Sequence, residues 1–135
     1  MADVKLEDNT VKVKAAINDR VNAALEECAG ELESQVKRNT RVDTYQLKSS
    51  WTHKVDEDKS EAVVGSALEN AIWEEFGTGE YALHGDGRKG GWKYQDMRGK
   101  WHFTLGKTPS RALWNAFTAL KAKIVKRIED SLKGL

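Results

Sequence analysis

The sequence of 135 residues has one cysteine, one proline and no long apolar run. The single cysteine, Cys28, excludes a disulfide framework. Its helical spacing from Leu25 and Leu32 favours a buried core position over a reactive thiol. No stretch approaches the roughly 20 apolar residues that a membrane-spanning helix needs. The first ten residues, MADVKLEDNT, carry acidic side chains, so we expect no signal peptide there. These absences predict a soluble protein made in a reducing cytoplasm.

The chain also has almost no net charge, +1, but its charges are unevenly distributed. Residues 1–76 carry 10 basic and 16 acidic side chains, whereas residues 77–135 carry 12 basic and 5 acidic ones. This asymmetry fits an acidic face that meets the basic face of another copy. It equally fits a basic face for phosphate, or two solvated surfaces that merely differ. The length predicts a single domain, 1–135, that needs no metal or disulfide to fold.

Hydrophobic periodicity predicts two long amphipathic helices. The first, about 15–38, has an apolar stripe formed by Ile17, Val21, Leu25, Cys28, Leu32 and Val36. The second, about 109–133, is expected to begin at Pro109 with Thr108 as its N-cap. Its stripe is formed by Leu113, Phe117, Leu120, Ile124, Ile128 and Leu132. Residues 3–14 alternate between apolar and polar side chains, which fits either a short hairpin or a frayed helix start.

The segments between these helices predict hairpins. Residues 50–55 and 61–66 are rich in β-branched and aromatic side chains and flank a charged loop. Residues 92–95 and 100–104 flank a second turn at 96–99. A turn is expected at 39–44, and a short helix at 67–76 that ends at Gly77. The predicted fold class is α+β, with a small, mostly antiparallel sheet of hairpins packed against the two long helices.

Glycine and tryptophan are concentrated between residues 73 and 106. This stretch holds eight of the eleven glycines and three of the five tryptophans. Glycine permits bends and close backbone approach, and tryptophan forms large buried contacts and interface anchors. The combination predicts a long shaped loop, about 77–91, that orders against a substrate, a nucleic acid or another subunit.

Two glycine patterns in this region match phosphate-binding motifs only in part. The glycines at 85, 87 and 90 have the dinucleotide-binding spacing, but that fingerprint works only between a strand and a helix N-terminus. Here a predicted strand follows instead. Residues 106–108 resemble the end of a P-loop, but Trp101 stands where its first glycine should be. We therefore expect no nucleotide cofactor.

The titratable side chains show no catalytic pattern. His53, His84 and His102 lack metal-ligand spacing, and there is no second cysteine. Glu74 and Glu75 are adjacent on a predicted helix and so point to different faces. One solvated acid and one capping or interface acid explain this pair better than acid–base chemistry. We expect no catalytic residue, no metal and no enzyme activity.

Residues 88–102 interleave basic and aromatic side chains, as surfaces that bind single-stranded nucleic acid do. Arg88, Lys89, Lys93, Arg98 and Lys100 alternate there with Trp92, Tyr94, Trp101 and His102. Alternate residues of a hairpin face opposite sides, so an amphipathic hairpin with an aromatic underside explains the pattern equally well. A nucleic-acid-binding module that uses this hairpin is the alternative function.

Four strings of the sequence also match one family pattern. Residues 73–79, WEEFGTG, contain an EFGTG block, and a glycine-rich basic loop follows at 85–91. Residues 92–104 carry the aromatic hairpin. Pro109 then opens a helix in which Ala112 stands where an aromatic residue is usual, and Trp114 can take over the packing of that aromatic residue. Residues 41–51 contain a D-T-x-x-L-x-x-S segment with Tyr45 where glycine is usual. Together these strings resemble the head–tail joining and minor tail-component family of lambdoid long-tailed phages.

This resemblance, over roughly residues 15–133, implies a non-enzymatic virion component made in the host bacterial cytoplasm. Such proteins are adaptors at the neck that complete the tail or seal the head connector, and they assemble as rings, often hexamers. The implied partners are other neck, tail or head-connector proteins and further copies of the chain. A ring lumen would also allow weak contact with DNA. We expect the contacts to involve Glu75, Phe76, Gly77, Thr78, Gly79, Arg88, Lys89 and Trp92.

Overall fold

The computed structural model describes residues 6–41 and 46–133. Its elements are α1 (Thr10–Asn39), α2 (Gln46–Ser50), β1 (Trp51–Asp56), β2 (Glu61–Ser66), α3 (Asn70–Phe76), the 3-10 turn η1 (Gly79–Tyr81), β3 (Trp92–Gln95), β4 (Trp101–Thr104) and α4 (Ala112–Ser131). The predicted α+β class is confirmed. The strands form two separate two-stranded antiparallel sheets, β1–β2 and β3–β4. Tyr45 and residues 42–44 of the predicted turn at 39–44 lie outside the described residues.

Helix α1 begins earlier than the periodicity predicted. It starts at Thr10, so the frayed helix start is confirmed and the alternative, a short hairpin over residues 3–14, is wrong. Residues 3–5 of that segment lie outside the described residues. The Asp8 carboxylate accepts a hydrogen bond from the Thr10 amide at 3.0 Å, which satisfies one of the free amides of the first turn. At the other end, the Thr40 hydroxyl donates to the Val36 carbonyl at 2.6 Å. Cys28 is buried in this helix, as expected.

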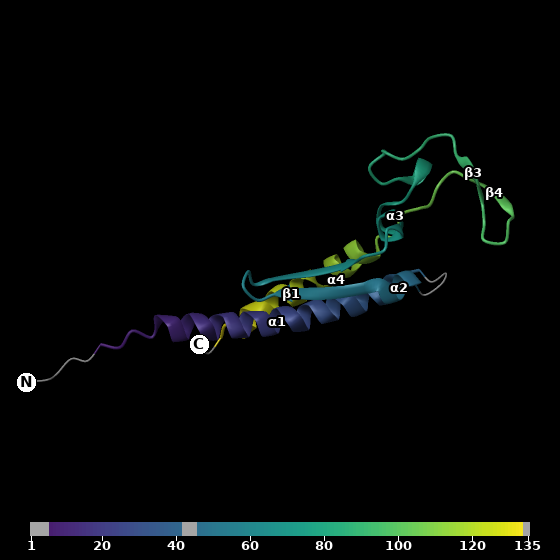
Figure 1. The fold of residues 1–135 in the computed structure, drawn as a ribbon. Helices are drawn as coiled ribbons and strands as arrows, with labels where there is room; N and C mark the ends of the chain where they lie inside the picture. The colour runs from purple at the N-terminus through teal and green to yellow at the C-terminus, as the bar shows by residue number, and fades with distance from the viewer. Residues whose placement is uncertain (1–5, 42–45, 134–135) are drawn as a thin grey trace, which may run out of the picture.

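The body of the molecule is made of three elements packed along one another. Helix α4 lies beside α1, and the β1–β2 hairpin lies along α1 (Figure 1). Ion pairs link the two helices, between Arg127 and Glu27 at 2.6 Å and between Lys123 and Glu31 at 2.5 Å. Among the described residues, the buried core is small, and its main cluster consists of Val36, Leu47, Trp51, Ala71, Ala112 and Ala116. In the described part of the chain, no helix combines the length and apolar character needed to cross a membrane.

Trp51 joins this core to the end of α1. Its side chain is only 4% exposed, and its indole N–H donates to the Thr40 hydroxyl oxygen at 2.9 Å. Trp51 is also the first residue of β1, where it pairs with Ser66 of β2. One side chain therefore holds the start of the hairpin against the C-terminal end of α1.

The β1–β2 hairpin also carries a histidine that faces two carboxylates of α1. His53 Nε2 lies 2.6 Å from Glu26 Oε1, and Nδ1 lies 3.4 Å from Glu33 Oε2. The hydrogen bond to Glu26 raises the pKa of His53, opposed in part by desolvation of the ring. A carboxylate partner favours the charged form of an imidazole.

This contact predicts that stability falls as the pH rises. Because the folded pKa of His53 is raised, its contribution is fully present below the unfolded value of about 6.5 and is lost as the pH rises through the folded pKa. We expect a higher free energy of unfolding in urea at about pH 6 than at about pH 8.5, and a smaller difference in His53→Gln. His84→Gln, at a ring that faces Phe76, is the matched control. An unchanged pH difference in His53→Gln would contradict the assignment.

The second long helix begins later than expected. It starts at Ala112, so Pro109 as its first residue and Thr108 as its N-cap are wrong. The preceding chain is tied to α3 instead, because the Ser110 amide donates to the Glu74 carbonyl at 2.6 Å. Arg111 then adopts the left-handed region, with φ of 56°, and turns the chain into the helix.

The glycine-rich segment crosses over the chain that returns from the second hairpin. The Thr78 amide donates to the Lys107 carbonyl and the Glu80 amide to the Leu105 carbonyl, both at 2.8 Å. A Cβ at Gly79 would overlap the Leu105 carbonyl oxygen, and φ there is +61°. Glycine is needed here because two backbones touch within the subunit.

Beyond this crossing, residues 79–106 form an arm that ends in the β3–β4 hairpin and projects away from the long helices (Figure 1). The four paired positions run from Trp92 opposite Thr104 to Gln95 opposite Trp101. The Asp96 carboxylate accepts hydrogen bonds from the Arg98 and Lys100 amides, both at 2.9 Å, and thereby shapes the turn. The prediction of this hairpin is confirmed.

The aromatic side chains on the two faces of the arm hairpin differ in their contacts and in their exposure to solvent. On one face Tyr94 stacks on His102, with ring centroids 5.2 Å apart. On the other face Trp101 and Phe103 are 65% and 62% exposed. The expected aromatic underside is therefore accompanied by a second aromatic face that is open to solvent.

Candidate functional site: an apolar groove

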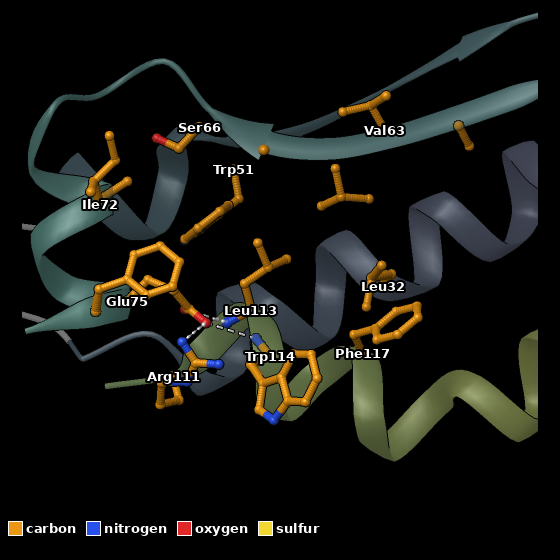
Figure 2. Close-up of a pocket in the computed structure, with 15 residues that line it drawn as sticks. Leu32, Trp51, Val63, Ser66, Ile72, Glu75, Arg111, Leu113, Trp114 and Phe117 are labelled. Carbon is orange, nitrogen blue, oxygen red and sulfur yellow. Dashed lines mark hydrogen bonds and ion pairs between the residues drawn. The ribbon is translucent and has the colours of Figure 1, made fainter. Parts of the chain in front are cut away.

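An apolar groove of about 730 Å³ opens between the β1–β2 hairpin, α3 and the first turns of α4 (Figure 2). Its lining includes Val63 of β2, Ile72 of α3, Trp114 and Phe117 of α4, and Leu32 of α1. Val63, Ile72 and Trp114 are 63%, 62% and 52% exposed. Large apolar side chains gathered in one exposed patch mark interaction sites in soluble proteins.

The groove exists because, among the described residues, no third strand covers the free edge of β2. Strand β2 pairs with β1 on one side only, and five consecutive residues of β2, 62–66, line the groove. Residues from both faces of a strand can line one groove only when the groove runs along the strand edge. A strand edge presents unpaired backbone groups, which natural proteins usually cover.

The polar centre of the groove is the Glu75 carboxylate of α3. It is only 7% exposed, and it accepts hydrogen bonds from the amides of Leu113 at 3.0 Å and Trp114 at 2.9 Å. These are free amides of the first turn of α4, where the helix dipole favours an anion. Glu75, which belongs to α3, therefore caps α4. It is the capping acid that the sequence predicted within the pair at 74 and 75.

Arg111 completes this centre. Its Nη1 atom lies 3.8 Å from Glu75 Oε1. Its guanidinium lies over the rings of Phe76 and Trp114, 5.3 and 5.4 Å from their centroids. Such contacts add cation–π attraction to the ion pair. Together they hold the Trp114 ring at the groove wall (Figure 2).

Comparison with known families identifies the first part of the chain. Residues 5–77, more than half of the chain, match a family described as "Bacteriophage HK97-gp10, putative tail-component". The chain belongs to this phage tail-component family. The match spans α1, the β1–β2 hairpin and α3, and it ends at Gly77. No curated protein and no solved structure matches the chain.

Membership in this family indicates where the protein is located and which class of partner it has. As a phage tail component it is part of the virion and contacts other phage structural proteins. A family of tail components also favours a structural role over an enzymatic one. In residues 6–41 and 46–133, no three His, Cys, Asp or Glu side chains are grouped so that they could hold a metal ion.

In this tail component the eight residues expected to make contacts fall into three places. Glu75 and Phe76 lie at the groove, and residues 77–79 lie at the backbone crossing. On the arm, the Arg88 guanidinium lies 5.7 Å from the centroid of the Trp92 ring, and Lys89 Nζ lies 3.8 Å from Glu80 Oε2. Two of these places adjoin, because the Trp92 ring lies against Gly79 and lines one pocket with Thr78. The structure therefore brings residues 78, 79, 88 and 92 together and leaves Glu75 and Phe76 at the groove. Arg88 and Lys89 are exposed, whereas Gly79 is buried.

The expectation that one acid of the pair at 74 and 75 is solvated is wrong. The Glu74 side chain is only 12% exposed. It accepts a hydrogen bond from Arg41 Nη2 at 3.1 Å and also pairs with Lys107. Both acids therefore hold segments of the tail component together, because the chain on either side of the arm packs against α3.

Sequence reasoning missed most of the groove. Phe117 was assigned to the core stripe of α4, but it is 39% exposed at the groove. Val63 and Val64 are adjacent in β2, and only Val64 packs against the core. A strand with one covered face should alternate apolar and polar residues. The run of apolar side chains at 62–64 is the signal that could have indicated a second apolar contact.

Proposed function

We propose that this tail component is a head–tail joining or tail-completion adaptor that assembles as a ring at the neck of the virion. The observation that supports it is that one subunit exposes two unlike apolar surfaces, the groove of the body and the outer face of the arm hairpin. Contacts between unlike surfaces of identical subunits are heterologous and generate rings when the rotation closes. The net acidic first part and net basic second part of the chain suit the same geometry.

Electron microscopy of particles from a parent phage with this gene interrupted tests the proposal. We expect DNA-filled heads and complete but unattached tails to accumulate side by side. Missing or overlong tails would instead assign the protein to tail assembly or length control. Normal infectious particles would overturn the adaptor role.

The exposed basic residues of the arm are expected to contribute to joining. Replacing both Arg88 and Lys89 with glutamate should lower the infectious titre by at least about tenfold, because like charges placed in an interface cost several kcal/mol. The purified variant should keep its melting temperature, since both side chains are exposed. Lys121→Glu with Lys126→Glu, on the exposed side of α4, changes the net charge equally and serves as the control. An undiminished titre in the arm variant would remove the arm from the proposed contact.

The alternative, binding of single-stranded nucleic acid, is favoured by the exposed Trp101 ring next to Lys100. A gel shift with single- and double-stranded DNA at moderate salt distinguishes the two functions. The adaptor should bind weakly at most. Tight binding that falls steeply with salt concentration would support the alternative, because it reports many phosphate contacts.

A further inference from the structure

The arm hairpin projects from the subunit, whereas the groove is a hollow in it. The hairpin is a convex element whose outer face presents Trp101 and Phe103, both more than 60% exposed. The groove is concave, apolar and about 730 Å³ in volume. Because the arm projects away from the helices, a subunit does not fill its own groove with its own hairpin (Figure 1).

The charges of the two surfaces are complementary. The hairpin, residues 92–104, carries three basic side chains and one acidic one, Asp96. Asp96 is already engaged by His102 at 2.7 Å. Strand β2 leads from the groove to the β1–β2 turn, where residues 56–61 carry four acidic side chains and one basic one. A basic hairpin lying along β2 would therefore approach an acidic turn, which favours one orientation.

The edge of β2 gives the groove a preference for an extended occupant. Strand β2 is paired on one side only, and its free edge runs along the groove. Strand β4 is likewise paired on one side only, with β3. An extended segment that lies beside a free strand edge can bind its backbone groups as well as its side chains.

From these observations we propose that the β3–β4 hairpin of one copy docks into the groove of the next, with Trp101 and Phe103 packed against Val63, Ile72 and Trp114. The contact is heterologous, so each copy has one free hairpin and one free groove until the ring closes. The proposal rests on the ring assembly proposed above and names the surfaces that form it. The occupant of the groove is a second copy of this chain.

Chemical cross-linking between two different variants tests this contact. One chain carries Lys100→Cys beside Trp101, and the other carries Val63→Cys in the groove. The native Cys28 is buried and does not compete. Mixed at high protein concentration with a flexible bis-maleimide reagent, the two chains should form covalent heterodimers. A partner chain with Val125→Cys, at a half-exposed position of α4 away from the groove, is the control and should give few.

Two further variants show whether the apolar contact carries the association. Trp101→Ser with Phe103→Ser in the Lys100→Cys chain should reduce the heterodimer yield at least about tenfold, since a few buried aromatic side chains carry most of the binding energy of an interface. Ile72→Lys in the Val63→Cys chain should do the same from the groove side. Melting temperatures close to that of the parent would show that both variants fold, as expected for exposed positions.

A heterodimer yield no greater than that of the Val125→Cys control would overturn the contact, as would a yield unaffected by the serine and lysine substitutions. Microscopy of gene-interrupted particles separates this failure from failure of the adaptor role. Unattached tails without cross-linking would leave the adaptor role standing and remove this contact. Cross-linking together with normal infectious particles would keep the contact and remove the adaptor role.

Discussion

Replacing Trp51 with alanine is expected to lower the free energy of unfolding by about 3–5 kcal/mol, the usual effect of truncating a buried aromatic side chain. The core contains few large side chains, and Trp51 contacts the cluster that includes Val36 and Leu47. Its loss also leaves the Thr40 hydroxyl without the indole donor. A domain is typically stable by only about 5–15 kcal/mol, so this single change removes a large fraction of the total.

Urea denaturation followed by circular dichroism measures the effect. Trp51→Phe should cost less, because it keeps a buried ring and loses mainly one hydrogen bond, worth about 1 kcal/mol. Trp101→Ala is the matched control, since that indole is exposed on the arm. If Trp51→Ala were no more destabilising than Trp101→Ala, the described core would be wrong.

Replacing Glu75 with alanine is expected to lower the free energy of unfolding by about 2–4 kcal/mol. Loss of a helix cap costs about 0.5–2 kcal/mol, and here two amides of α4 lose their acceptor at once. The Arg111 guanidinium, only 21% exposed, also loses its carboxylate. A partly buried charge without a partner is strongly unfavourable.

Thermal and urea unfolding of a short series test this role. Glu75→Gln should be intermediate, because its amide oxygen can still accept a hydrogen bond but carries no charge for the helix dipole. Glu69→Ala is the control, since Glu69 is exposed and makes no side-chain capping bond to α3. Equal stability of Glu75→Ala and Glu69→Ala would show that α4 does not depend on this cap.

The elements that sequence reasoning predicted well are those whose cause is local. Strand β2 was predicted to the residue, because β-branched side chains and a charged turn mark it directly. The arm hairpin followed from its aromatic residues and from the turn residues at 96–99. The end of α3 at Gly77 followed from glycine's access to positive φ, observed at 76°.

The parts that could not be predicted have causes far along the chain. Helix α4 begins at Ala112 because the Glu75 carboxylate, 38 residues before Leu113, caps it. This tertiary contact, and not the local signal of Thr108 and Pro109, sets the start of the helix. The need for glycine at position 79 depends on Leu105, which only the folded chain brings close. The groove itself depends on the absence of a third strand beside β2 among the described residues. No local sequence pattern predicts which strands will pair, so the groove could not be predicted.

The crossing at Thr78 and Lys107 has one further consequence. The chain leaves the body and returns to it at points joined by a hydrogen bond of 2.8 Å, so the arm between them has the geometry of an insertion, with its two ends held together. Insertions of this kind can change in length and sequence with little disturbance to the host domain. The family match stops at Gly77, at the base of this insertion. Under the proposed contact, the segment that binds the neighbouring copy can therefore vary in sequence while the packed helices and the β1–β2 hairpin keep their fold.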